Sequence, residues 1–576
     1  MVKMRYCCLT LVLLLVIPLI SPGQVLRLIP YNGTSASLLE QQVIADSTAN
    51  NGIPAGRIYE LQRGKVYCTQ AQFNLRKGLR LYIRANDSTG SRPVVMLYPS
   101  ATTGNPTLPW NLTGGDFILK NVIVSGYFEP VDSNYRNIQG NIIRTQTVAG
   151  GSITVDSCII KSASGQFIRT EAGMHNVIVT NSIFADMGFI GRSDLGAGKF
   201  IDLRETACDS LVIVNNTFVN FQDRIIRHYN LSGAGATSPI KYLTFEHNTL
   251  VNGMSFHGLL SLGSLGYKAV VANNLFLDPF VLGEDTTNTV RALEFGRTLE
   301  TYPSGTNRIV WAFSAPNDTT QWYVKNNYYA ISDSGQAFLN EEKAYLRDSV
   351  NVKGFEKVLG VGSPLSYHIY SKVDSATAFI KLPSLTLGNI PQLSKMLRLC
   401  RWYLYPPVNR QKLNSSTLFK DTLHHYDRRS YQYYDDTLDC TYSTSSPAYT
   451  GARLGYPAGD LNWYPAKLAQ WLSDPRVTNV QEPEPQTVPT GFSLGQNYPN
   501  PFNPSTTLEF SIPKSSHVVL EVFNVLGQSV ARLVDGAMSA GTYRTTFDAS
   551  NLSSGVYLYR LKAGEFVQAR KMVVMK

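Results

Sequence analysis

A short phrase of apolar residues followed by an arginine recurs four times between residues 141 and 228. It reads NIIRT, QFIRT, DLRET and RIIRH, with successive arginines 25, 35 and 23 residues apart. If these positions are equivalent in a repeated structure, four guanidinium groups stack on one face. A planar guanidinium holds a carboxylate through two parallel hydrogen bonds, so this face suits a ligand with recurring carboxylates. The arginines are Arg144, Arg169, Arg204 and Arg227.

Like charges stacked on neighbouring strands are unfavourable unless anions lie among them. One source of anions is internal, because Glu171, Asp202, Glu205 and Asp223 lie close to the arginines in sequence. The other source is a bound polyanion such as a uronate polymer. The sequence leaves both interpretations open.

A lyase acting on uronic acids needs a cation that neutralises the carboxylate, a base for the C5 proton and an acid for the leaving oxygen. Arg144, Arg169 and Arg204 are the candidate substrate-binding residues. The candidate catalytic residues are Lys199 or Arg227 as the base and His228 or Tyr229 as the acid.

Two other kinds of chemistry use the acidic residues of the same region. Calcium could replace arginine as the neutralising cation, with Glu171, Asp202 and Glu205 as oxygen ligands. A glycoside hydrolase would need two carboxylates at a defined separation, and Asp202, Glu205 and Asp223 are the candidates. No catalytic signature of a polysaccharide lyase, a Ser-His-Asp triad or a Cys-His pair is recognisable in the sequence.

A second recurring phrase indicates the fold that must position these residues. It reads VTNSIF at 179–184, VNNTFV at 214–219, EHNTLV at 246–251 and ANNLFL at 272–277, with weaker copies outside this stretch. Its period-2 alternation of β-branched and aromatic residues predicts strand, turn, strand. A spacing of a few tens of residues without helical patterns indicates a solenoid. The aligned polar column is Asn121, Ser157, Asn181, Asn216, Asn248, Asn274 and Asn327.

These features, over roughly residues 50 to 335, resemble the right-handed parallel β-helix of the pectate-lyase-like superfamily. The resemblance implies the fold, with a ladder of asparagines at one corner, and does not select an activity. An open solenoid end would expose unpaired strand edges. We therefore expect a short amphipathic capping helix near the N-terminus, at SASLLEQQVIAD (35–46), begun by a serine cap.

The C-terminal residues have a different pattern, with five or more short strands that predict a small Ig-like β-sandwich. YPNPFNPST, VFNVLGQSV and SGVYLYRL, with a basic last strand, resemble the C-terminal sorting domain of type IX secretion cargo in Bacteroidetes-like bacteria. The resemblance implies recognition by the type IX secretion machinery, export across the outer membrane, and an extracellular or surface-attached protein.

The remaining boundaries follow from composition. Residues 1–23 have a basic start and an apolar run that predict a secretory signal peptide. Residues 24–335 are assigned to the β-helix, 336–480 to its C-terminal part and cap, 481–489 to a Pro-rich linker and 490–576 to the sorting domain. The predicted fold class is therefore all-β, a β-helix solenoid followed by a β-sandwich.

The net charge and the lengths of the apolar segments argue against several functions. The net charge of +10 is mild for 576 residues and no Lys/Arg run stands out, which argues against nucleic acid as a partner. No segment after the signal peptide is long and apolar enough to predict a membrane span. Two classes remain: a surface protein that binds or cleaves an acidic polysaccharide, and a non-catalytic glycan-binding or envelope structural protein.

Overall fold

A computed structural model describes most of the chain. The described residues are 25–99, 107–126, 139–188, 198–204, 206–228, 239–253, 259–279, 300–301, 307–308, 312–314, 319–348, 365–404, 433–474, 491–498, 500–514, 516–538 and 541–575. The predicted signal peptide and the predicted linker at 481–489 lie outside them. The chain divides into two compact units, Leu19–Leu468 and a smaller one that includes Ala469–Lys576.

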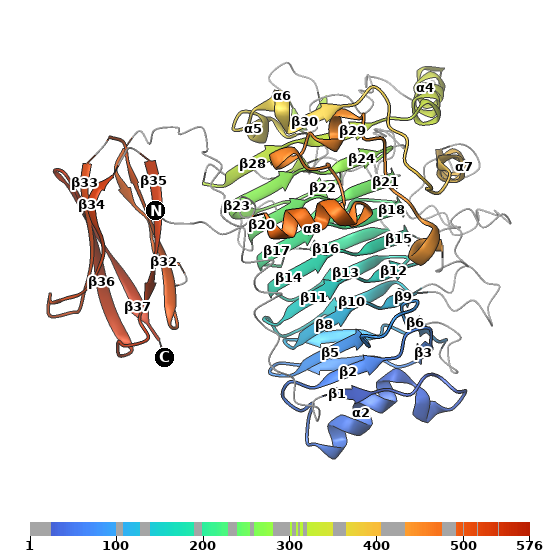
Figure 1. Cartoon of the computed structure of the whole chain (residues 1–576), viewed down its shortest axis with the longest axis horizontal. Helices are drawn as coiled ribbons and strands as arrows, with labels where there is room; N and C mark the ends of the chain where they lie inside the picture. Colours follow the sequence, from blue (N-terminus) through green and yellow to red (C-terminus); the bar gives the residue numbers. More distant parts are fainter. Residues whose placement is uncertain are drawn as a thin grey trace. The chain divides into compact units, whose positions relative to one another are not determined.

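The larger unit is a parallel β-helix built from three long sheets, which confirms the predicted solenoid (Figure 1). Each sheet receives one strand per turn of the chain, so every strand pairs in parallel with the strands one turn before and after it.

Sheet A contains β1 (Val25–Arg27), β2 (Ile58–Leu61), β5 (Arg80–Ala85), β8 (Asp116–Lys120), β11 (Ser152–Asp156), β14 (Met174–Thr180), β17 (Cys208–Val214), β20 (Ile240–Glu246), β23 (Leu265–Ala272) and β28 (Gln321–Lys325). Sheet B contains β3 (Val66–Thr69), β6 (Val94–Leu97), β9 (Ile123–Ser125), β12 (Ile159–Lys161), β15 (Ile183–Met187), β18 (Thr217–Phe221), β21 (Thr249–Gly253), β24 (Leu275–Leu277), β29 (Asn327–Ala330) and β30 (Phe379–Lys381). Sheet C contains β4 (Phe73–Arg76), β7 (Trp110–Thr113), β10 (Asn141–Thr145), β13 (Gln166–Thr170), β16 (Lys199–Arg204), β19 (Ile226–His228), β22 (Leu260–Ser261) and β27 (Ala312–Phe313). A separate antiparallel pair is formed by β25 (Glu300–Thr301) and β26 (Asn307–Arg308).

Inward side chains of the three sheets form one continuous core. Its centre is a stack of aromatic rings, in which Phe184 lies 4.3 Å from Phe200 and 5.3 Å from Phe218 between ring centroids. Stacking equivalent apolar residues on successive turns removes them from water without any helix, as the period-2 pattern predicts.

The corner between sheets A and B contains the predicted asparagine ladder, but in a corrected register. Asn216, Asn248, Asn274 and Asn327 are buried and joined side chain to side chain, with Nδ2 of each donating to Oδ1 of the next over 2.8–3.1 Å. Asn121, Ser157 and Asn181 do not belong to this column. They align one position earlier, with residues that adopt left-handed backbone angles such as Asn215 and Asn273.

Left-handed angles are tolerated by asparagine better than by most residues, because its short side chain bonds locally. Each turn therefore offers two adjacent positions that favour asparagine: a strained corner residue and an inward ladder residue. Asn-Asn pairs such as Asn215–Asn216 fill both, and the sequence alignment merged the two columns.

The N-terminal cap is confirmed as helix α2 (Leu39–Ala49), preceded by a short 3-10 turn, Ser35–Ser37. Leu39 and Val43 of α2 pack into the solenoid core. The predicted serine cap is wrong, because the residue before the helix is Leu38 and no side chain caps it.

Residues after β29 contribute one further strand, β30, to sheet B and form several helices. They form α4 (Asp333–Asp348), α5 (Tyr367–Tyr370), α6 (Ser375–Ala378), α7 (Leu393–Leu404) and α8 (Pro465–Ser473). Residues 433–464, here called the cover segment, lie over the outer face of sheet B. Outward Val219, Val251 and Leu275 pack with Tyr442 and Ala458 of the cover segment, which explains why both faces of the sheet B strands are apolar.

The smaller unit is an antiparallel sandwich of two sheets, as predicted. One sheet contains β31 (Ser493–Leu494), β32 (Ser505–Ile512) and β35 (Gly541–Asp548), and the other contains β34 (Ser529–Met538), β33 (Ser516–Phe523), β36 (Gly555–Ala563) and β37 (Phe566–Val574). Within the described parts of both units, no helix is sufficiently long and apolar to span a membrane.

Candidate functional site

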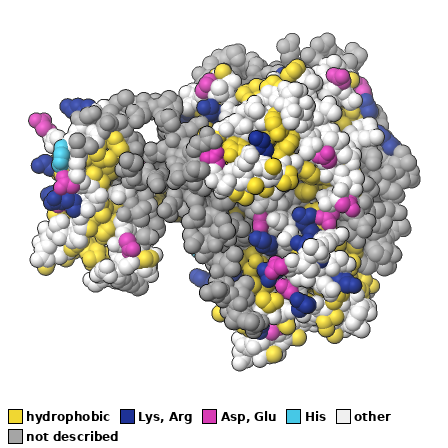
Figure 2. All heavy atoms as spheres, in the orientation of Figure 1, with side chains coloured by type: hydrophobic (Ala, Val, Ile, Leu, Met, Phe, Trp, Pro, Cys, Tyr) yellow, Lys and Arg dark blue, Asp and Glu magenta, His cyan; other side chains and the backbone are white. Residues whose placement is uncertain are grey.

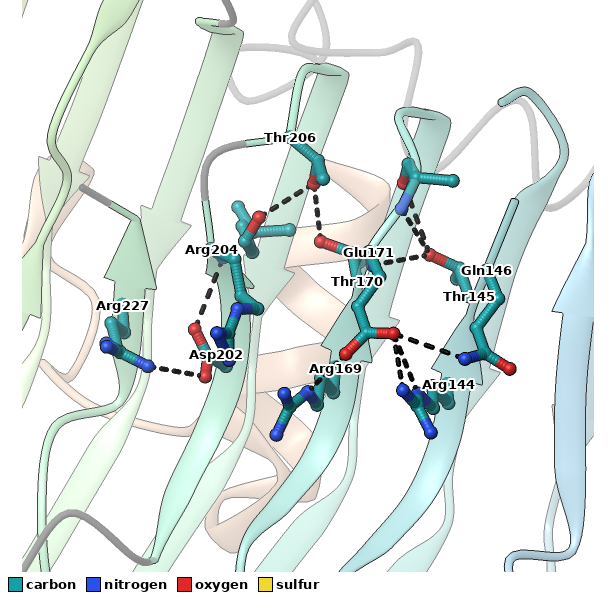
Figure 3. Close-up of polar contacts among 12 residues, drawn as sticks. Arg144, Thr145, Gln146, Arg169, Thr170, Glu171, Asp202, Arg204, Thr206 and Arg227 are labelled. Carbon is teal, nitrogen blue, oxygen red and sulfur yellow. Dashed lines mark hydrogen bonds and ion pairs between the residues drawn. The ribbon is translucent and has the colours of Figure 1, made fainter. Parts of the chain in front are cut away.

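The predicted arginine stripe lies on the outer face of sheet C, but only three of its four members share a row. Register pairs Arg144 with Arg169, Arg169 with Asp202, and Asp202 with Arg227. Asp202, not Arg204, therefore occupies the equivalent position on β16. The prediction that Arg204 continues the column is wrong in this respect, and a carboxylate interrupts the row (Figure 3).

Arg204 is displaced because β16 ends in an irregularity. The register shifts between Asp202 and Arg204, so that Arg204 lies opposite His228. Its φ of +48° is left-handed, and its backbone N–H donates to Oδ1 of Asp202 over 3.2 Å. β-Bulges of this kind re-aim side chains and are enriched beside functional sites. Among the described residues, no carboxylate or carbonyl pairs with the Arg204 guanidinium.

Glu171 joins the first two arginines. Its Oε2 accepts from Nε and Nη2 of Arg144, over 3.0 Å and 2.5 Å, and its Oε1 accepts from Nε of Arg169 over 3.0 Å. Partial burial alone would raise the pKa of this carboxyl, but hydrogen bonds from Arg144 and Gln146 and the two arginine charges lower it overall. Glu171 is therefore held ionised, as the internal-pairing interpretation predicts (Figure 3).

Asp202 and Arg227 form a second internal pair. The Nη1 of Arg227 donates to Oδ2 of Asp202 over 2.8 Å, and the aspartate is fully buried. Burial lowers the pKa of Arg227, with the Asp202 charge acting in the opposite direction. Removing one partner of a buried ion pair strongly destabilises the folded protein. Asp202 and Arg227 therefore stabilise sheet C in addition to belonging to the row on its outer face.

Lys199 lies at the start of β16, almost completely enclosed. Its Nζ is 2.9 Å from Oδ2 of Asp223, which also contacts Arg224 at 3.4 Å. Burial lowers the pKa of Lys199, and the Asp223 charge opposes that effect. A lowered pKa suits a base, but the amine is committed to a buried ion pair.

His228 is also buried, with Nδ1 3.0 Å from the carbonyl of Leu262 and Nε2 3.1 Å from the carbonyl of Thr206. Both ring nitrogens thus face backbone oxygens. The structure brings Lys199, Arg227 and His228 to neighbouring strands of one sheet, and Arg227 is the most accessible of the three. Glu205 and Tyr229 lie outside the described residues.

The predicted calcium ligands that the structure describes are paired with arginine side chains. Glu171 and Asp202 are each engaged with arginine, and in the described part of the chain no group of three or more His, Cys, Asp or Glu side chains is arranged to hold a metal.

One residue of this site, Gln146, was not predicted from the sequence. Gln146 donates from Nε2 to Oε2 of Glu171 over 3.2 Å. It lies two residues after Arg144, as Glu171 lies two residues after Arg169. The matching phrases RTQ (144–146) and RTE (169–171) could have predicted this contact. Residues two positions apart on a strand point to the same face, so Gln146 and Glu171 are expected beside the arginines.

Comparison with known protein families concerns the smaller unit. Residues 496–575 match the secretion system C-terminal sorting domain. A sorting domain of this kind marks proteins exported through the type IX system to the cell surface or the extracellular space, so this chain is an exported protein. Neither the curated proteins nor the solved structures contain a match to the chain. The resemblance of the solenoid to pectate lyases stays a prediction from the sequence.

Proposed function

We propose that this exported protein binds an acidic polysaccharide along the outer face of sheet C. The supporting observation is an imbalance of charge. Arg144, Arg169, Arg204 and Arg227 share this face with Glu171 and Asp202, and the nearby Asp223, whose charge also acts on Arg227, is paired with Lys199. The internal pairs therefore compensate part of the positive charge, and a polyanion would supply the rest.

Arg204 provides the strongest support for this proposal. It is aimed by the irregularity in β16, and the anion partners of its neighbours do not reach it. Arg144 and Arg169 retain 32% and 26% of their side-chain exposure, so their guanidinium groups can contact a ligand while Glu171 holds them in place. Arg144 and Arg169 lie on adjacent strands, about 4.8 Å apart at the backbone, and Arg227 follows two strands later because Asp202 occupies the strand between.

Binding is favoured here over cleavage by the enclosure of two of the candidate catalytic residues, Lys199 and His228. His228 and Lys199 are each only 2% exposed, and Lys199 is paired with Asp223. A lyase that used either residue would need it to reach a substrate proton, and Arg227, the alternative base, is paired with Asp202.

The test is binding of the purified full chain to polygalacturonate, comparing the native protein with Arg204→Ala. Loss of one unpaired cation should weaken binding about fivefold or more, since charge-assisted hydrogen bonds contribute about 1–3 kcal/mol each. Arg80→Ala, an exposed arginine on sheet A, is the matched control. An unchanged affinity in Arg204→Ala, or equal losses in both variants, would reject the proposal. Absorbance of unsaturated uronate products, followed in the same samples, tests for cleavage.

A further inference from the structure

The four-stranded sheet of the smaller unit has an unusual outer face. On β36, Tyr557, Tyr559 and Leu561 are buried in the sandwich, and the residues between them point outward. The solvated face of an antiparallel sheet is normally polar. Here Val556 and Leu558 are 41% and 42% exposed.

The neighbouring strand β37 continues this face. Val567 is 56% exposed and pairs with Lys562, while Lys571 pairs with Leu558. Both lysines are exposed, and within the described residues no carboxylate pairs with either ammonium group. Figure 2 shows hydrophobic and basic side chains on the surface of this unit.

Arg560 points outward from β36 between these residues, and two contacts hold its side chain in place. Its guanidinium lies 4.7 Å from the ring centroid of Phe523, and its Nη2 is 3.4 Å from Oε2 of Glu521. Stacking on an aromatic ring and pairing with a carboxylate hold an otherwise flexible side chain. We call Val556, Leu558, Arg560, Lys562, Val567 and Lys571 the basic patch.

The opposite sheet shows that exposed apolar residues are not general in this sandwich. On β32 the outward positions are Thr507, Glu509 and Ser511, which alternate with buried Leu508 and Phe510. The outer face at β32 is thus polar, whereas the outer face at β36 and β37 carries exposed apolar and basic side chains, with Glu521 of β33 paired to Arg560 and Arg532. Val556 and Leu558 are outward neighbours on β36, and exposed apolar residues grouped on one face mark interaction surfaces.

We propose that the basic patch is the surface by which the sorting domain docks onto the export machinery, and that its partner is a protein surface with carboxylates around an apolar centre. Charge complementarity selects this partner, because the patch presents two unpaired lysines beside exposed valine and leucine. Because the Arg560 guanidinium is held in one place by Phe523 and Glu521, it favours a protein partner whose acceptor groups are also fixed in position. The most exposed apolar side chains, Val525 and Leu526 at the tip of the β33–β34 hairpin, lie outside the patch.

The test is export of the full chain carrying Lys562→Glu and Lys571→Glu in a host with a type IX system. The fraction accessible to external protease should fall at least tenfold, and the protein should accumulate in the periplasm. The matched control is Lys514→Glu with Lys77→Glu, two exposed lysines outside the patch, which should be exported normally.

Export of the patch variant at the native level would overturn the proposal. So would binding of the purified native chain to phosphatidylglycerol vesicles that the patch variant loses, because the patch would then recognise a lipid surface. Thermal unfolding of the purified variant checks its fold. If the charge reversal unfolds it, Lys562→Gln with Lys571→Gln decides by the same protease readout, with native-level export again overturning the proposal.

Discussion

Asp202 occupies on β16 the position that Arg169 occupies on the adjacent strand β13. A row that would have been four stacked cations is therefore interrupted by a carboxylate, which pairs with Arg227 on the next strand. The sheet tolerates its arginines because anions lie among them. Arg204, moved out of the row, remains the cation for which the described residues provide no partner.

Glu171 should limit the affinity of this face for polyanions. Glu171→Gln removes the carboxylate that Arg144 and Arg169 share, so both guanidinium groups become available to a ligand. Half-exposed ion pairs contribute up to about 1 kcal/mol, and binding to polygalacturonate should strengthen about two- to fivefold. Isothermal titration measures the change.

Asp87→Asn makes the same change of charge on an exposed residue that pairs with Arg84 of sheet A. It should leave the affinity for polygalacturonate unchanged. Weaker binding by Glu171→Gln would mean that the carboxylate positions the arginines for the ligand rather than competing with it.

The asparagine ladder should contribute measurably to stability. Asn248→Ala removes a side chain whose Nδ2 donates to Asn274 and to the carbonyl of Ile213, and whose Oδ1 accepts from Asn216. Leaving buried polar groups unpaired costs about 1–3 kcal/mol each. The free energy of unfolding, followed by circular dichroism in denaturant, should fall by about 3 kcal/mol or more.

Asn176→Ala is the comparison, because Asn176 is half-buried on sheet A and donates only a long hydrogen bond of 3.4 Å to Ser152. It should change the free energy of unfolding by about 0.5 kcal/mol or less. Equal losses in the two variants would show that the ladder has no special role.

The cover segment should make stability depend on pH through Asp460. Its carboxylate is buried on sheet B, where Oδ2 accepts from Thr217 over 2.7 Å. Burial raises the pKa of Asp460 to about 7, against an ordinary value of 3.8. A raised pKa means that the folded state holds the proton more tightly. The contribution of Asp460 to stability is therefore fully present below about pH 4 and is lost as the pH rises to about 7.

His247 contacts the same segment, through Nδ1 and the carbonyl of Gly459 at 3.1 Å, and acts in the opposite direction. Burial lowers its pKa from 6.5 to about 3, so its contribution is present above about pH 6.5 and is lost as the pH falls toward 3. The two trends oppose each other between about pH 4 and pH 6.5, and the native protein should show little of either.

Asp460→Asn should reveal the pH dependence of stability that Asp460 and His247 together mask in the native protein. Relative to the native protein, the variant should gain stability as the pH rises from about 4 to about 7, by up to about 1.4 kcal/mol per pH unit. Denaturant unfolding of both proteins across this range measures the difference. A difference that is constant with pH would show that Asp460 does not change its protonation in this range.

The sorting domain should be required for export. A chain that ends at residue 489 lacks the matched region 496–575, and it should remain in the periplasm while the full chain reaches the surface. Cell fractionation with external protease distinguishes the two locations. Normal surface display of the shortened chain would remove the assigned role of this domain.

The sequence predicted the solenoid and the sandwich because both rest on repeated local patterns. Strand alternation and corner asparagines recur at every turn, so errors in single turns do not affect the fold. The register of individual residues was harder to predict. Asn181 was placed in the ladder, although Ser182 is the aligned residue, with a backbone N–H that donates to Asn216 over 3.0 Å.

The candidate site shows the same limit. In the sequence, the phrase DLR looks like another copy of IIR, although the aligned triplet on β16 is FID, ending in Asp202. Only the irregular pairing between Asp202 and Arg204 separates the two alignments. The role of the cover segment depends on contacts such as Asp460 with Thr217, hundreds of residues apart in sequence, which no local pattern encodes.

The most direct test of the account is the affinity of the full chain for polygalacturonate and for a neutral glucan, each measured at about 0.1 M and about 1 M salt. Over this range the Debye length falls from about 10 Å to about 3 Å. We predict binding to polygalacturonate that weakens at least severalfold in high salt, and no binding to the neutral glucan. Equal affinity for both polymers, or binding that salt does not change, would contradict it.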